Sequence, residues 1–314
     1  MLARPKDEGL EGLAALPSQL RVTRGQFPAD FQERTPPDAI LVCSGGRALL
    51  EPVWPLAQGV RWVHSRWAGI EKLLFPALVE SETTLTNGRG SFADSLGEFV
   101  MAAVLFFAKD LRRMRRKQAE GCWDPFEPEW VRGKTLGVVG YGEIGRAVAQ
   151  RARAFGMSVI GLRRRPEQSA GDALVDGVWP LERLNDVMAR ADYVLVATPL
   201  TPETRGLVGL AAIAAMKPTG VLINVGRGPC VDEQALVRAL ESGRIRGAAL
   251  DVFEQEPLPA GHPFYRLDNV LLSPHCADHV AGWLDDAMTL FLDNLDRFRR
   301  GAPLLNVVDK RAGY

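Results

Sequence analysis

Three residues in the second half of the chain, Arg227, Glu256 and His275, have side chains that could together reduce a carbonyl group. A guanidinium can hold a substrate carboxylate with two parallel hydrogen bonds and can polarise a keto oxygen. An imidazole can give that oxygen a proton as hydride arrives, provided that a carboxylate keeps the ring protonated near neutral pH. These residue types predict reduction of a 2-keto acid, on the condition that Glu256 lies within hydrogen-bonding distance of His275.

The elements that must position these side chains are predicted to form a doubly wound parallel sheet. Apolar runs recur with helical patterns between them, which is typical of this architecture. Such sheets bind ligands beyond the carboxyl ends of their strands, so the polar residues just after each run are the candidates for a site. The runs are Tyr193–Ala197, Val221–Val225, Ala248–Val252 and Val270–Leu272.

A glycine-rich turn ahead of these runs predicts a dinucleotide site. Gly140 permits the tight turn, Gly142 lets the backbone approach a pyrophosphate, and Gly145 lets a helix pack on the preceding strand. The phosphates then meet free N–H groups and the positive end of the helix dipole. A second apolar run, Ser158–Leu162, completes the strand–turn–helix–strand context that this motif requires. The candidate cofactor-binding residues of the turn are Gly140, Gly142, Glu143, Ile144 and Gly145.

The end of the second strand bears on which nicotinamide cofactor binds. Folds that prefer NAD usually place an acid about 20 residues beyond the glycines, where it binds the ribose 2′-hydroxyl. Here that place is Arg163, and Arg164 follows it in a run of three arginines. Guanidinium groups bind a 2′-phosphate with charge-assisted hydrogen bonds. The alternative is a solvated basic turn. We expect NADP(H) to be preferred, with NAD(H) possible.

Taken singly, the three candidate catalytic residues have ordinary structural explanations. A histidine after a strand is more often a loop or core residue than an acid catalyst, and Arg227 could be a surface arginine. Their joint placement at strand ends of one nucleotide-binding sheet favours catalysis. His275 and His279 have a spacing that metal ligands can have on a helix, but Pro274 and the lack of acidic ligands argue against a metal.

Composition narrows the class of protein further. Lys plus Arg equals Asp plus Glu, at 38 each, so no net field draws the chain to nucleic acid or membrane. No apolar run approaches the roughly 18 residues that span a bilayer, and the charged amino terminus does not look like a signal peptide. The four cysteines are scattered. We therefore expect a cytoplasmic enzyme with reduced thiols.

The part of the chain before the glycine turn is expected to form a smaller open α/β domain. Short β-like runs alternate there with loops and amphipathic segments, at Leu20–Val22, Ala39–Cys43, Arg61–His64 and Thr83–Leu85. His64 ends one of these runs, so a contact with substrate is possible. Ser91–Lys117 has the apolar spacing of one or two long helices.

At this point the chain resembles the D-isomer-specific 2-hydroxyacid dehydrogenase family, and within it the glyoxylate/hydroxypyruvate reductases. The motifs that carry the resemblance follow the family's order through the whole central domain. They are Leu136–Gly145, Tyr193–Gly206, Ile223–Leu236, Leu250–Pro257 and Ser273–Ala277.

The resemblance implies Arg227, Glu256 and His275 as the catalytic set. It also implies that Asp251 and Thr198 lie beside the nicotinamide half of the cofactor, and we count Pro199 with them as cofactor-binding. The segment Ser65–Ile70 is similar to the family's loop whose backbone amides hold the substrate carboxylate. By position, the substrate-binding amides would belong to Ala68 and Gly69, which act together with Arg227.

For the whole chain, the resemblance implies two Rossmann-like open parallel-sheet domains with the active-site cleft between them. A returning helix, about Trp283–Arg300, closes the first domain. We therefore expect residues 1–102 and 283–314 to form the substrate domain and residues 103–282 to form the dinucleotide-binding domain. Members of the family are usually homodimers joined through the nucleotide domains, so a homodimer is expected.

Some positions depart from the family pattern. Arg163 replaces the usual acid, which supports NADP over NAD. Trp67 is bulkier than the small residue often found in its loop, so the size of the substrate side chain stays open.

The sequence thus predicts an NADP(H)-preferring reductase of 2-keto acids, with glyoxylate or hydroxypyruvate as default substrates. One alternative is an NAD-dependent phosphoglycerate dehydrogenase, although the chain ends soon after the closing helix and leaves no room for an added regulatory domain. The other, from a different class, is a non-catalytic, nucleotide-sensing protein like a corepressor.

Overall fold

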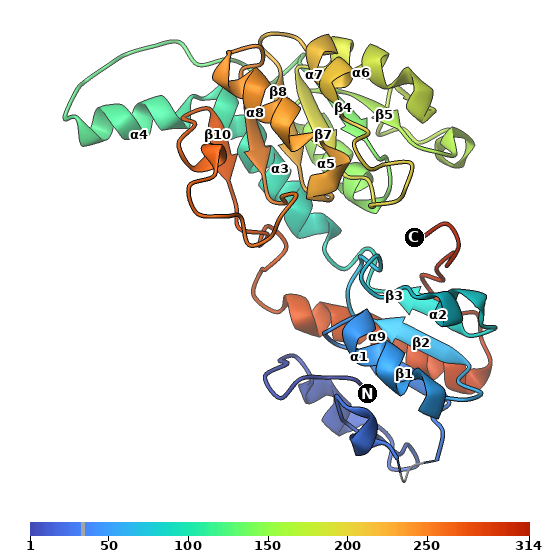
Figure 1. Ribbon diagram of the computed structural model, residues 1–314. Helices are drawn as coiled ribbons and strands as arrows, with labels where there is room; N and C mark the ends of the chain where they lie inside the picture. The colour runs from blue at the N-terminus through green and yellow to red at the C-terminus, as the bar shows by residue number, and fades with distance from the viewer. Residues whose placement is uncertain (33–34) are drawn as a thin grey trace. The chain divides into compact units, whose positions relative to one another are not determined.

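The computed structural model describes residues 1–32 and 35–314, which form two compact units (Figure 1). Residues 1–91 and 280–314 make the first unit, and residues 92–279 make the second. In the described residues, no helix is both long and apolar enough to cross a membrane.

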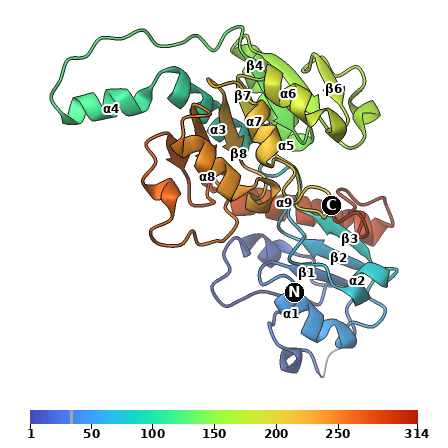
Figure 2. The same ribbon diagram turned by 45° about the horizontal axis from the view of Figure 1, so that its top comes forward.

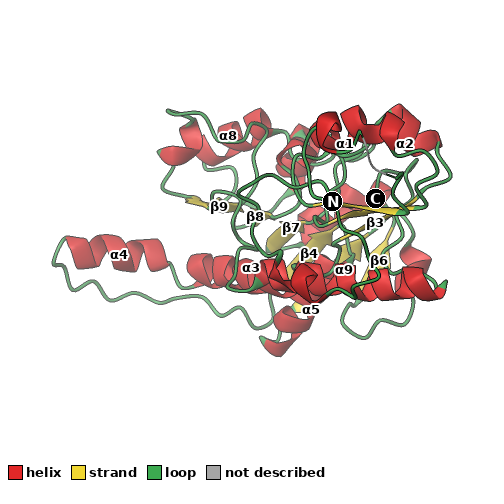
Figure 3. Cartoon of the chain, turned by 90° about the horizontal axis from the view of Figure 1, so that it is seen from below, coloured by secondary structure: helices red, strands yellow, loops and turns green. Residues whose placement is uncertain are grey.

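The first unit contains a three-stranded parallel sheet in the order β1-β2-β3. Its elements include β1 (Ala39–Val42), β2 (Trp62–Ser65), β3 (Thr84–Asn87), α1 (Arg47–Val53), α2 (Pro76–Glu80) and α9 (Trp283–Arg300). Side chains alternate along β1, as the pleat of a strand requires. Ile40 and Val42 pack with α1 and α2, whereas Leu41 packs with α9. Both faces of this small sheet are therefore covered by helices (Figure 3).

The strand prediction for Leu20–Val22 is wrong. In the described part of the chain this segment has no strand neighbour, and Val22 is exposed. The run has only three residues, with the charged Arg21 in the middle, and it pairs with no sheet edge among the described residues. The nearby Gly25 makes only an isolated bridge to Leu2, which also bridges to Val42.

The second unit contains a seven-stranded parallel sheet in the order β10-β9-β8-β7-β4-β5-β6. Its strands are β4 (Thr135–Val139), β5 (Ser158–Leu162), β6 (Gly177–Trp179), β7 (Tyr193–Val196), β8 (Val221–Asn224), β9 (Gly247–Leu250) and β10 (Val270–Leu272). The strand order reverses direction between β4 and β7. Ligands of doubly wound sheets bind at such a switch point, beyond the carboxyl ends of the strands.

Helices cover both faces of this larger sheet. They include α3 (Ala93–Ala108), α5 (Glu143–Ala154), α6 (Leu184–Arg190), α7 (Leu210–Ala215) and α8 (Glu233–Glu241), whereas α4 (Leu111–Ala119) has no buried residue. The apolar sides of α6, α7 and α8 share one core with the strands. Helices α3 and α5 pack together and lie on the opposite side of the strands from α8 (Figure 3).

The predicted strands of this unit are confirmed to within two residues at each end, and α9 spans the residues expected for the closing helix. Strand β6 was not predicted from the sequence, because it has only three residues and begins with a glycine. A strand this short carries too little alternation to be recognised without its neighbour.

Candidate functional site

The glycine turn adopts the geometry that its sequence predicts. Gly140 has a φ of +98°, and a Cβ there would lie 2.8 Å from the backbone of Thr198. A Cβ on Gly145 would lie 2.8 Å from a methyl carbon of Val138, so only glycine lets α5 pack this closely on β4. A Cβ on Gly142 would meet nothing within 4 Å, so open space lies beside this glycine.

The start of α5 suits the pyrophosphate of a dinucleotide. Among the described residues, the N–H groups of Glu143, Ile144 and Gly145 have no hydrogen-bond acceptor, and no side chain caps the helix. These donors and the helix dipole attract negative charge. The hydroxyl of Thr198, at the end of β7, is buried and has no hydrogen-bond partner. Open space beside Gly142, free donors and an unsatisfied hydroxyl are the features that a bound dinucleotide would use.

Arg163, directly after β5, has two hydrogen bonds from its guanidinium to neutral oxygens. It donates to Ser169 Oγ at 2.6 Å and to Gln168 Oε1 at 2.7 Å. Among the described residues, no carboxylate forms an ion pair with it. No carboxylate among these residues therefore neutralises its positive charge, at the position where the sequence predicts that a 2′-phosphate binds. Arg164 beside it is exposed and contributes to lowering the pKa of Glu203, after the hydrogen bonds that this carboxylate accepts from Thr201 and a backbone N–H.

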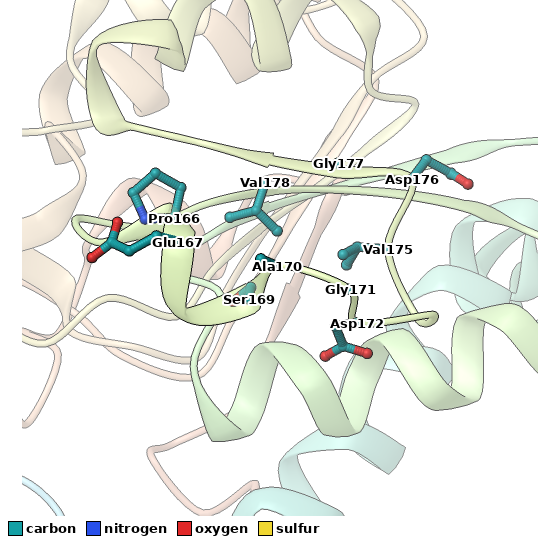
Figure 4. A pocket seen from close by; sticks show the side chains of 10 residues that line it. All are labelled: Pro166, Glu167, Ser169, Ala170, Gly171, Asp172, Val175, Asp176, Gly177 and Val178. Atoms are coloured by element: carbon teal, nitrogen blue, oxygen red, sulfur yellow. The ribbon is translucent and has the colours of Figure 1, made fainter.

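A pocket next to Arg163 lies between residues 166–172 and the start of β6 (Figure 4). Ser169, one of the partners of Arg163, contributes to its lining. So do the carboxylates of Glu167, Asp172 and Asp176. Asp172 accepts hydrogen bonds from Arg146 and Tyr141, and Asp176 forms an ion pair with Arg153. Because its lining is acidic and contains none of the fingerprint glycines, this pocket is unsuited to a phosphate.

The ends of strands β7, β8 and β9 meet around Arg227. The glycines on either side of it permit this approach. A Cβ on Gly226 would lie 2.8 Å from Thr198 O, and one on Gly228 would lie 1.9 Å from the backbone of Phe253. Arg227 is half-buried, and its Nη1 donates to Gly226 O at 2.8 Å.

His275 and Glu256 form the hydrogen bond on which the sequence prediction depended. His275 Nδ1 lies 2.8 Å from Glu256 Oε2, and the second oxygen of Glu256 accepts from Phe253 N at 3.0 Å. Both side chains are partly open to solvent, with 40% of the His275 side chain exposed. The carboxylate supplies the counter-charge for an imidazolium, and the bond through Nδ1 leaves Nε2 as the atom that can exchange a proton with a ligand.

The loop that carries His275 is held by Asp251. His275 has a φ of +53°, a conformation that is uncommon for residues with a side chain. The buried carboxylate of Asp251 stabilises it, because Oδ1 accepts from Ser273 Oγ, Cys276 N and Ala277 N at 2.6, 2.9 and 3.1 Å. Asp251 thus fixes the backbone on both sides of His275.

Asp278 places another carboxyl group near this loop. Burial raises its pKa, and the nearby His279 and His275 oppose that rise. Its Oδ1 is buried without a hydrogen-bond partner and lies 3.6 Å from His279 Nε2.

Ala68 and Gly69 lie in the first unit, just after β2. Both are partly exposed, and in the part of the chain that the structure describes, neither backbone N–H donates to a protein acceptor. Two consecutive free amides can bind a carboxylate. Trp67, beside them, packs its ring 5.3 Å from that of Trp283 and donates from Nε1 to Cys43 O at 2.7 Å.

A contact of His64 with substrate was left open by the sequence, and the structure does not support it. Its side chain is fully buried in the first unit, beside the rings of Trp62 and Phe291. Thr86 Oγ1 accepts from Trp62 Nε1 at 2.8 Å, so its proton is available for His64 Nδ1 at 2.7 Å. Burial lowers the pKa of His64 to about 4, which keeps the ring neutral. The strand continues to Ser65, so His64 lies inside β2 and its side chain faces the core.

Two polar residues that were not predicted from the sequence contact the candidate site residues in the structure. Ser273 Oγ donates a hydrogen bond to Asp251 Oδ1 at 2.6 Å, and Asn87 Nδ2 donates one to Ala68 O at 2.6 Å. A signal existed for each, since Ser273 and Asn87 are polar residues at the ends of apolar runs, and Asn87 begins an Asn-Gly pair typical of turns.

Residues 101–277 match the family model described as D-isomer specific 2-hydroxyacid dehydrogenase, NAD binding domain. This match covers more than half of the chain. The chain belongs to the D-isomer specific 2-hydroxyacid dehydrogenase family. It is accordingly an oxidoreductase with a Rossmann-type domain for a nicotinamide dinucleotide.

Individual relatives carry names of two kinds. The chain is 32% identical over 297 residues to D-3-phosphoglycerate dehydrogenase of Methanocaldococcus jannaschii, covering 93% of this chain but only 55% of that relative, or about half of its length. It is 37% identical over 268 residues to the glyoxylate reductase of Korarchaeum cryptofilum, covering 82% of this chain and 79% of the relative.

Among solved structures, the chain is similar to the NADPH-dependent glyoxylate/hydroxypyruvate reductase from Sinorhizobium meliloti, in complex with NADP and sulfate. The TM-score is 0.82 at 29% identity, covering 98% of this chain and 96% of the other.

Proposed function

We propose that the chain is an NADP(H)-preferring D-2-hydroxyacid dehydrogenase that acts mainly as a reductase of small 2-keto acids, with glyoxylate or hydroxypyruvate as default substrates. The observation that carries the proposal is the 2.8 Å hydrogen bond between His275 Nδ1 and Glu256 Oε2, at the strand ends of a dinucleotide-binding sheet. This pair leaves a partly exposed imidazole with a carboxylate behind it, as a general acid requires.

Each residue of the proposed site has one task. Arg227 and the amides of Ala68 and Gly69 bind and orient the substrate carboxylate. His275 holds a proton on Nε2 and gives it to the keto oxygen, while Glu256 stabilises the charged ring. When bound, the nicotinamide supplies the hydride that the carbonyl carbon accepts. The product is a D-2-hydroxy acid, and His275 regains its proton from solvent.

In the same proposal, different residues bind the pyrophosphate, the nicotinamide half and the 2′-phosphate of the cofactor. The turn from Gly140 to Gly145, with Glu143 and Ile144, holds the pyrophosphate. Thr198, Pro199 and Asp251 lie on the nicotinamide side, and Arg163 with Arg164 binds the 2′-phosphate. The neutral partners of Arg163 support this assignment, because its charge is not already neutralised by a carboxylate.

The cofactor assignment is tested by initial rates with NADPH and NADH in parallel, on glyoxylate, hydroxypyruvate, pyruvate and phenylpyruvate. The wild type should prefer NADPH, and an Arg163→Asp/Arg164→Ala variant should lose that preference by about tenfold to a hundredfold, as expected for hydrogen bonds to a charged group. Arg190→Asp is a matched control, because it reverses an exposed charge that ends α6, just before β7 begins. An unchanged NADPH/NADH ratio in the double variant would remove the role of the arginines.

A second candidate is an NAD-dependent phosphoglycerate dehydrogenase, favoured by the likeness to the Methanocaldococcus jannaschii enzyme over 93% of this chain. Oxidation of 3-phosphoglycerate with NAD at a rate above reduction of the 2-keto acids would establish it. Arg163 argues against it, because an NAD site usually has an acid at that position.

We also propose a homodimer formed through residues 111–130, the α4 arm. Helix α4 has no buried residue, and it and the following loop extend away from the rest of the second unit (Figures 1 and 2). Trp123 is 94% exposed, and Trp130 and Met114 are also exposed. Such a set of large apolar side chains indicates a surface that a second copy of the chain covers. Analytical ultracentrifugation should give twice the chain mass for the wild type. The Trp123→Glu variant should sediment as a single chain.

The proposal includes a cytoplasmic location, supported by four cysteines that are free in the structure.

A further inference from the structure

Two consecutive peptide groups, between Trp67 and Gly69, are held by their carbonyl oxygens. Trp67 O accepts from Gly88 N at 3.1 Å and from Ser65 Oγ at 3.2 Å. Ala68 O accepts from Asn87 Nδ2 at 2.6 Å. A trans peptide group is planar, so its C=O and N–H point in opposite directions. Fixing these two carbonyls therefore fixes the directions of the Ala68 and Gly69 N–H groups, which point away from Asn87 and Gly88.

Asn87 is itself held in one orientation at the end of β3. Its side chain is buried, and its Oδ1 accepts from Arg89 N at 3.4 Å, which leaves Nδ2 as the group that faces Ala68 O. Its backbone is fixed by the carboxy-terminal segment, because Asn306 O accepts from Asn87 N at 3.3 Å and Asn306 Nδ2 donates to Asn87 O at 3.2 Å.

Gly88 brings the two segments close enough for these bonds. A Cβ at this position would lie 2.3 Å from Arg66 O, so any side chain would push the two segments apart. The Asn87–Gly88 pair therefore contacts the segment Arg66–Ala68 at successive backbone carbonyls, from the side opposite its free amides.

We propose that Asn87 is a positioning residue that orients and polarises the Gly69 amide for a substrate carboxylate, beside the Ala68 amide, which Gly88 N orients through Trp67 O. It does not touch the substrate. A carbonyl that accepts a hydrogen bond makes the N–H of the same peptide group a stronger donor, so the 2.6 Å bond to Ala68 O strengthens the Gly69 amide. The inference rests on the proposed function, because it takes the substrate carboxylate to bind at these amides.

The test compares wild type with Asn87→Ala in steady-state kinetics and in inhibition by oxamate, an unreactive carboxylate-bearing analogue. We expect KM for glyoxylate and for hydroxypyruvate, and Ki for oxamate, each to rise about tenfold, the loss expected when charge-assisted hydrogen bonds weaken. The NADPH dissociation constant should stay unchanged and kcat should change by less than about twofold, since the proton donor is untouched. Asn87→Asp, which replaces the donor by a negative charge, should raise KM further.

A matched control is Asn269→Ala in the second unit. Asn269 also donates from its side-chain amide to a backbone carbonyl, that of Leu240 at 3.1 Å. This variant should lower thermal stability without changing KM. A merely structural Asn87 would behave in the same way, so a lowered melting temperature with unchanged KM and Ki would overturn the proposal.

If Asn87→Ala does not fold, Asn306→Ala provides the second test. It removes the bonds from Asn306 Nδ2 to Asn87 O and Arg89 O and leaves Asn87 in place. A rise in KM smaller than the tenfold expected for Asn87→Ala, with unchanged kcat, supports the inference. An unchanged KM overturns it. Failure of the proposed function looks different, because the wild type itself would then reduce no 2-keto acid.

Discussion

Two histidines, His64 inside β2 and His275 in the loop after β10, show how surroundings decide what an imidazole can do. Each bonds through Nδ1, His64 to the hydroxyl of Thr86 at 2.7 Å and His275 to the carboxylate of Glu256 at 2.8 Å. The distances are nearly the same, but the partners differ in charge. One ring is fully buried, and the other has 40% of its side chain exposed.

The two rings therefore differ in the charge beside them and in their access to solvent. Burial lowers the pKa of His64 to about 4, and its partner Thr86 is neutral, so no counter-charge opposes this shift. Its Nε2 is buried and has no hydrogen-bond partner in the described structure. Glu256 offers His275 a negative charge, and solvent can reach the ring. A histidine in or after a strand is therefore a candidate acid only when a carboxylate lies beside it and its ring is open to solvent. His64 has neither.

The largest effect should come from His275→Ala. Removing a positioned general acid typically costs about 10²- to 10⁴-fold in turnover, because the keto oxygen then takes its proton from water. We expect kcat for glyoxylate reduction to fall by that factor, measured by NADPH oxidation. NADPH affinity should stay nearly intact, since the fingerprint turn is unchanged.

The control for this variant is His64→Gln, which removes the other imidazole. It should keep wild-type kcat and lose about 1–3 kcal/mol of stability, because a buried hydrogen bond is disturbed. If His275→Ala retained full turnover, or if His64→Gln abolished it at a temperature where the variant is folded, the roles assigned to the two residues would have to be exchanged.

The second unit could be predicted from the sequence in most of its detail. The glycines at 140, 142 and 145 each have the local geometry that their spacing indicates. That Glu256 and His275 lie at the same edge of the sheet also follows from topology, because parallel strands have their carboxyl ends at one edge. What the sequence could not supply was the hydrogen-bond distance and the three bonds by which Asp251 fixes the loop.

The first unit was less predictable for a physical reason. Its strands have four residues each, and its cores draw on segments far apart in the chain, such as Trp62 with Phe291. A four-residue run does not reveal which of its side chains turn inward, so the burial of His64 could not be predicted. The bond from Asn87 to Ala68 likewise depends on how β3 lies beside β2, which no local pattern encodes.

The smallest effect concerns the stability of the chain in acid, which tests whether His64 stays neutral in the folded protein. The folded pKa of about 4 lies below the usual value of 6.5, because burial disfavours the charged ring. Above pH 6.5 both folded and unfolded states hold the ring neutral, so His64 adds no pH dependence. Between pH 6.5 and 4 the unfolded state takes up a proton that the folded state refuses, so stability falls as the pH falls.

The loss should reach about 2 kcal/mol at pH 5, at about 1.4 kcal/mol for each pH unit below 6.5. Urea unfolding of wild type and His64→Gln at pH 7.5 and pH 5 measures it, since the variant cannot bind this proton. We expect the drop in unfolding free energy between the two pH values to be smaller in the variant by that amount. Equal drops would mean that His64 is charged in the folded protein, and the contrast with His275 would then rest on exposure alone.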